Sequence, residues 1–117
     1  MDSILLTIKK MLGLDASYEV FDQELVIFIN SALMVLEQVG LGPNGFAITG
    51  VSETWDQFLT DISKFEGVKT YVYIKTRLSF DPPTNASLLK SFEDAAKELE
   101  WRLNVKSEHE HDYVDSY

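Results

Sequence analysis

The stretch VKTYVYIKTRLSF, residues 68–80, and the Asp81-Pro82-Pro83 that follows it govern the fold class, because the stretch fits two kinds of secondary structure. Apolar or β-branched residues alternate with polar ones along it, which is typical of a strand. A lone strand would leave its backbone groups unpaired, and only residues 46–51 could supply a partner. A helix is the alternative, with an apolar face made of Val68, Tyr71, Val72 and Leu78. Composition and periodicity leave both open. Either element is expected to end at Asp81-Pro82-Pro83, and a helix could not run through Asp81, because a residue before proline avoids the α region.

Four other segments combine helical periodicity with capping signals. We expect Asp22 to cap the second of these helices, and Thr54 with Gln57 to form a capping box for the third, which Gly67 should end. Two lysines, Lys9 and Lys10, suit the C-terminal end of the first. The predicted helices cover residues 3–12, 23–39, 55–66 and about 85–104. The expected apolar face of the third consists of Trp55, Phe58, Leu59, Ile62 and Phe65.

Residues 40–52 contain four of the six glycines, and Pro43-Asn44-Gly45 is a strong turn signal. Residues 46–49 could form one arm of a short hairpin. We therefore expect either a Gly/Pro-rich loop or a short β-hairpin around residues 41–51.

The charge is acidic and unevenly distributed: the formal net charge is −9 over 117 residues, and residues 1–58 hold eight acids and two lysines. Proteins that grip nucleic acid use clustered Lys and Arg, and this chain has only the Lys9-Lys10 pair. The absence of cysteine excludes disulfides and thiolate chemistry. No signal peptide is expected, and the longest uncharged apolar stretch, Leu25 to Leu36, is too short to span a bilayer. We expect neither secretion by a standard signal nor a membrane role.

No active site emerges from the motifs. Glu108-His109-Glu110-His111-Asp112 resembles a set of metal ligands, but it lies in an acidic tail, residues 106–117, with nothing to fix its geometry. We expect that tail to be mobile without a partner and residues 1–105 to form one helical domain. Gly40, Gly42 and Gly45 match a dinucleotide-binding pattern only in spacing, because they follow a helix and open none. No enzyme activity, cofactor or metal is predicted.

Three large apolar side chains fall on polar faces of predicted helices. Ile27 and Met34 lie a heptad apart on such a face of the second helix, and Trp101 lies opposite Phe92 on the last. A partner surface would explain all three. The alternatives are ordinary exposed apolar area for Ile27 and Met34, and packing under another segment of the chain for Trp101.

Several pieces of sequence, in their order and spacing, resemble the small head–tail connector proteins of tailed bacteriophages and prophages, the neck adaptors that dock beneath the portal. The likeness covers most of residues 4–104. It rests on the Leu12-Gly13-Leu14 end of the first helix, Phe21-Asp22, Glu53 to Leu59, Val68 to Val72, Lys75 to Pro83, and Glu98 to Leu103. The family motif assigns structural roles to Trp55, Arg77, Phe80, Asp81, Pro82, Pro83, Glu100 and Arg102. Arg77 and Arg102 are expected to pair within the chain, with Asp81 or Glu98.

The resemblance implies a mainly α fold, a small bundle of about five helices, with residues 68–80 helical. It implies a homo-oligomeric ring of about twelve copies between the portal protein and the next neck or tail protein, with DNA passing through unbound. The protein would be made in the host cytoplasm and act in the virion, at the head–tail junction. Free copies could be monomers. The competing hypotheses are an acidic DNA mimic that inhibits a basic protein and, ranked last, a metal enzyme built on the tail histidines.

Overall fold

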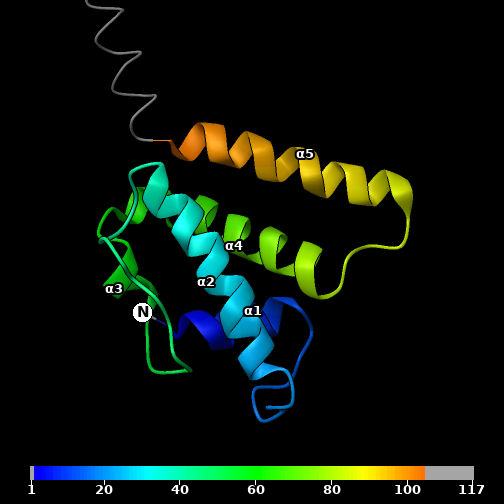
Figure 1. Cartoon of the computed structure of the whole chain (residues 1–117), viewed down its shortest axis with the longest axis horizontal. Helices are drawn as coiled ribbons and strands as arrows, with labels where there is room; N and C mark the ends of the chain where they lie inside the picture. Colours follow the sequence, from blue (N-terminus) through cyan, green and yellow to red (C-terminus); the bar gives the residue numbers. More distant parts are fainter. Residues whose placement is uncertain (1, 105–117) are drawn as a thin grey trace, which may run out of the picture.

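The computed structural model describes residues 2–104, which form a helical bundle (Figure 1). Its elements are α1 (Ile4–Met11), α2 (Asp22–Gln38), α3 (Trp55–Phe58), the 3₁₀ turn η1 (Ile62–Lys64), α4 (Phe65–Phe80) and α5 (Ala86–Leu103). Residues 2–104 contain no strand, and their only bridge is an isolated pairing of Ser3 with Thr54. The mainly α fold class is confirmed.

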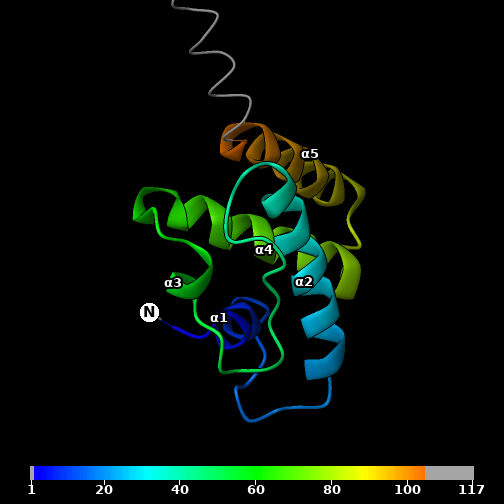
Figure 2. The ribbon, with the colours of Figure 1, turned by 60° about the vertical axis from the view of Figure 1, so that its left-hand side comes forward.

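Helix α4 is the centre of the bundle. Helices α2 and α5 both pack against it, and α1 contacts α2 and α4 (Figures 1 and 2). The strand interpretation of residues 68–80 is therefore wrong. A helix covered from two sides buries much of its circumference, which obscures its 3.6-residue periodicity. Its buried residues are spread accordingly: Val68, Tyr71, Val72, Ile74 and Thr76.

The predicted third helix is also wrong, because it is two elements with a break between them. Helix α3 ends at Phe58, Leu59 is extended, and the Asp61 carboxylate accepts from the Ser63 amide to begin η1. Gly67 lies inside α4 rather than at the end of a helix. A Cβ there would come within 3.3 Å of Leu103, so this glycine serves the close packing of α5 on α4.

The loop from 41 to 51 contains no hairpin. The side chain of Asn30 on α2 takes the place of a strand partner: its Oδ1 accepts from the Ile48 amide at 2.8 Å, and its Nδ2 donates to the Ile48 carbonyl at 3.0 Å. The Gly/Pro-rich loop was the correct alternative, and a side chain satisfies the backbone that a second strand would have paired.

The connector between α1 and α2 is organised by a buried lysine. Lys9 is 1% exposed, and its ammonium donates to the carbonyls of Ala16 and Tyr18 at 3.1 and 2.7 Å. It also pairs with Asp22 at 2.8 Å. The prediction that Asp22 caps α2 is therefore wrong. Asp22 is the first residue of the helix, Phe21 is the N-cap, and the Asp22 carboxylate pairs with Lys9 instead of capping. Three oxygens compensate the buried charge of Lys9, and the connector is held against α1.

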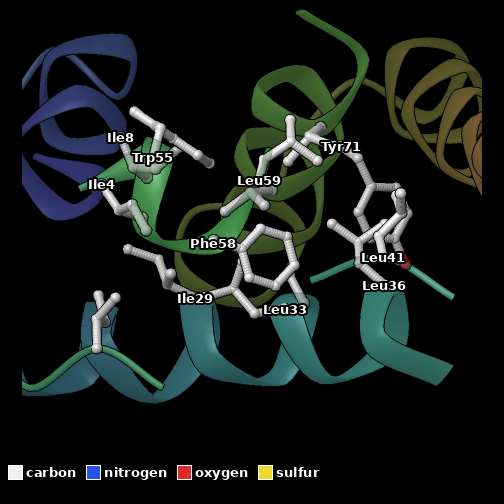
Figure 3. Close-up of a cluster of buried hydrophobic side chains, with 14 of the residues drawn as sticks. Ile4, Ile8, Ile29, Leu33, Leu36, Leu41, Trp55, Phe58, Leu59 and Tyr71 are labelled. Carbon is white, nitrogen blue, oxygen red and sulfur yellow. The ribbon is translucent and has the colours of Figure 1, made fainter. Parts of the chain in front are cut away.

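The core lies where α1, α2, α3 and α4 meet, and its side chains point toward one another there (Figure 3). Trp55 and Phe58 bring the one-turn helix α3 into this space, against Ile4 and Ile8 of α1 and Ile29 and Leu33 of α2. Helix α5 contributes only Ala96 and Leu103 as buried residues, which leaves most of its surface outside the core.

Candidate assembly surfaces

Trp55 is a core residue. It is fully buried, its indole N–H donates to the Thr7 hydroxyl at 3.0 Å, and its ring meets Phe65 edge-on at 5.7 Å. The capping box predicted at Thr54 is present, because the Thr54 amide donates to the Gln57 side chain at 3.0 Å. This part of the family motif therefore positions α3 against α1.

The Arg77-to-Pro83 part of the motif forms the turn between α4 and α5. Arg77 donates from Nε to the Asp81 carbonyl at 3.3 Å and from Nη1 to the Tyr73 hydroxyl at 3.0 Å. Its guanidinium also lies 5.2 Å from the centre of the Phe92 ring on α5. Arg77 thus meets Asp81 through its backbone rather than its carboxylate, and the arginine connects the end of α4 to α5.

Two neighbours of Arg77 support the same turn. The Phe80 ring meets Phe21 edge-on at 5.1 Å, and this contact fixes the end of α4 against the α1–α2 connector. Pro83 is buried, while Pro82 is exposed.

Glu100 and Arg102 make two different contacts on α5. The buried Tyr71 hydroxyl donates to the Glu100 carboxylate at 3.0 Å, which ties α5 to α4. Burial, reinforced by the negative charge of Glu100, raises the pKa of Tyr71 well above its ordinary value. Arg102 pairs with Glu98 at 2.8 Å on the exposed surface, where such a pair contributes only tenths of a kcal/mol, about 0.3–0.5.

The structure places the three apolar residues of the polar faces on the outside. Ile27 is 63%, Met34 54% and Trp101 67% exposed. At 100° per residue, Ile27 and Met34 point about 160–180° away from the side of α2 that packs on α4. Trp101 likewise points away from the side of α5 that carries Ala96 and Leu103. Both helices therefore present apolar groups outward from the bundle.

Sequence reasoning missed further exposed apolar side chains. Ile62, expected on a buried helical face, is 74% exposed because the helix breaks before it. Val20 and Val51 are exposed in connectors, where no periodicity could have marked them.

Val51 and Ile27 belong to a groove of about 530 Å³, which we call the α2–loop groove. Its lining combines apolar and acidic groups, among them Leu5, Glu19, Asp22, Val26, Ile27 and Val51. It lies between the first turns of α2, the connector that precedes them and the loop at 49–51.

Two negative findings concern residues 2–104, the part of the chain that the structure describes. In that range no three His, Asp or Glu side chains gather closely enough to hold a metal ion. The Glu108-to-Asp112 cluster and the rest of the acidic tail lie outside the described residues. None of the described helices has the length and apolar character needed to cross a membrane.

A sequence model of the phage connector protein family matches residues 4–110. The chain belongs to this family. The match reaches further than the resemblance described above, which ended at residue 104. No curated protein and no solved structure gives a significant match.

Membership makes this connector protein a structural component of a phage particle, at the head–tail connection with portal and tail proteins. The motif residues Trp55, Arg77, Phe80 and Glu100 all make contacts within the chain. The exposed residues Ile27, Met34 and Trp101 make no such contribution to the core.

Proposed function

We propose that this connector protein assembles as a closed ring of about twelve copies under the portal, extends the DNA channel and presents a surface to the next neck or tail protein. It would be made in the host cytoplasm and incorporated into the virion. The observation that carries the proposal is the exposure of large apolar side chains on two helices that lie on different sides of α4, namely α2 and α5.

A ring made of identical copies needs two different patches on each copy, because each subunit meets one neighbour with one patch and the other neighbour with the second. Helix α5 and the first turns of α2 lie at opposite ends of the molecule in both views (Figures 1 and 2). Trp101 on α5 and Ile27 in the first turns of α2 supply an apolar group to each side, and Met34 lies about two turns further along α2. This placement suits a head-to-tail contact.

The acidic charge suits a channel. Of the net −9, residues 1–58 contribute −6, from eight acids and two lysines. A surface that repels phosphate does not hold the duplex, so DNA can pass without specific binding. An acidic DNA mimic would share this charge, but it has no need for apolar groups on two sides. The exposed apolar groups and the family match both favour the connector.

The test is assembly of the full chain on purified portal protein of the same phage, followed by electron microscopy and native mass spectrometry. We expect the wild-type chain to add a ring to the portal. Trp101→Ala should lose most of that assembly while its helical circular dichroism stays unchanged. Ser91→Ala, an exposed change elsewhere on α5, should assemble like wild type.

Two outcomes would overturn the proposal. One is a wild-type chain that adds no ring to the portal. The other is Trp101→Ala unfolding the free chain, which would make Trp101 a core residue. Monomeric behaviour of the chain alone is compatible with the proposal, because the portal can serve as the template.

A further inference from the structure

We propose that the ring contact is a Trp101 side chain of one copy inserted into the α2–loop groove of the next copy, with Lys97 of the first facing Glu19 of the second. The proposal rests on the ring inferred above and names the two surfaces that meet in it. It commits to a second copy of this chain as the occupant of the groove.

The groove offers an apolar site with one unpaired acid at its edge. Val26, Ile27 and Val51 line it, and the buried Leu5 closes it on the side of α1. Of its two acids, Asp22 is already paired with Lys9, whereas Glu19 has no cation within ion-pair distance among residues 2–104. Its volume of about 530 Å³ leaves room for an indole ring. An apolar group that carries a positive charge beside it is the matching ligand.

The outer face of α5 has that combination. Trp101 stands 67% exposed, and Lys97 lies one helical turn before it on the same face. The other cations near it are occupied, since Lys90 pairs with Asp94 and Arg102 with Glu98. Lys97 has no carboxylate at ion-pair distance in the part of the chain described. The two surfaces therefore match in both apolar character and free charge.

Their positions allow the contact to repeat. Helix α5 and the start of α2 lie at opposite ends of the molecule, so no copy can fill its own groove with its own Trp101 (Figures 1 and 2). A contact between two different patches propagates from copy to copy and closes a ring when the rotation suits. A two-fold contact of Trp101 with Trp101 would stop at a dimer.

The absence of native cysteines permits a direct test by crosslinking. The full chain carrying Lys97→Cys and Glu19→Cys retains the Trp101 anchor. Treated with a short bis-maleimide on the portal, it should give a ladder of covalent dimers, trimers and higher species. The matched control pairs Glu19→Cys with Ser91→Cys, an exposed position on another side of α5 about 9 Å along the axis from residue 97. It should give no ladder, and adding Trp101→Ala to the first pair should abolish the ladder.

Charge reversal tests the same contact without crosslinking. Lys97→Glu alone and Glu19→Lys alone should each reduce ring formation several-fold, and the two together should restore it. Rings that form normally in both single variants, or that yield no ladder from the cysteine pair, would overturn this inference while the proposed ring stands. Covalent dimers from Lys97→Cys alone would also overturn this inference. A wild-type chain that forms no ring would overturn both this inference and the proposed function.

Discussion

Trp55 and Trp101 place the same side chain in opposite surroundings, with exposed fractions of 0% and 67%. Removing a buried tryptophan costs about 3–5 kcal/mol, because a cavity forms and the surrounding contacts are lost. Trp55→Ala should therefore lower the free energy of unfolding by about that amount. Trp101→Ala should change it by less than about 0.5 kcal/mol, as is usual for surface positions. Urea unfolding of the two variants measures both, and equal losses would contradict the assignment of Trp101 to the surface.

Tyr71 makes the stability depend on alkaline pH. Burial and the Glu100 carboxylate raise the pKa of Tyr71 in the folded chain, whereas the unfolded chain releases this proton near pH 10. The free energy of unfolding is therefore unaffected by this titration below about pH 10. Above about pH 10 it decreases, because the unfolded chain releases the Tyr71 proton while the folded chain keeps it. Tyr71→Phe should reduce the fall in unfolding free energy between about pH 9 and 11. An unchanged pH dependence, measured by urea unfolding across this range, would show that Tyr71 does not titrate differently in the folded chain.

At the scale of single residues, the helical wheel correctly placed Ile27, Met34 and Trp101 on exposed helix faces, because α2 and α5 are regular helices over the predicted residues. It could not identify Lys9. Nothing in the sequence of an exposed helix end indicates that a lysine turns inward to bind the carbonyls of a loop that follows it. Glu100 shows the same limit, because its partner Tyr71 lies on another helix.

At the scale of elements, two loop glycines with the same backbone conformation allow a matched comparison. Gly42 and Gly45 have φ of +74° and +76°, a region that costs an alanine about 1–2 kcal/mol. A Cβ on Gly45 would meet nothing within 4 Å, but one on Gly42 would lie 2.3 Å from the ring of Phe58. That ring is buried and cannot move away cheaply. Gly42→Ala should therefore cost about 1–3 kcal/mol more than Gly45→Ala. Equal midpoints in urea unfolding would mean that Phe58 is not fixed beneath the loop.

The elements that sequence reasoning located correctly are those with one packed face. Helices α1, α2 and α5 begin and end within about two residues of their predicted bounds, which is the usual margin. The errors lie in α3 and α4. A glycine after an apolar helical run usually marks the end of the helix. Gly67 instead lies within α4, because Leu103, which is distant in sequence, packs so closely that a small residue is required there. The hairpin near residue 48 failed because Asn30 supplied the hydrogen bonds from a helix.

At the scale of the whole molecule, α4 separates two helices that each keep an apolar group facing outward. The core cluster does not include Ile27, Met34 or Trp101, so folding of the single chain leaves these three side chains uncovered. Large exposed apolar groups on a folded chain mark contact sites when they gather into patches. Under the proposed function, the occupant of each such surface is a sister copy of this connector protein.

The most direct test of whether sister copies cover the exposed apolar side chains is oxidative footprinting of the full chain, both free and assembled on the portal. The modification of each residue is measured by mass spectrometry. Trp101 and Met34 should be modified readily in the free chain and several-fold less in the assembly. Trp55 should be protected in both and serves as the internal reference. Equal modification of Trp101 and Met34 in the free and assembled states would contradict the claim that sister copies cover them.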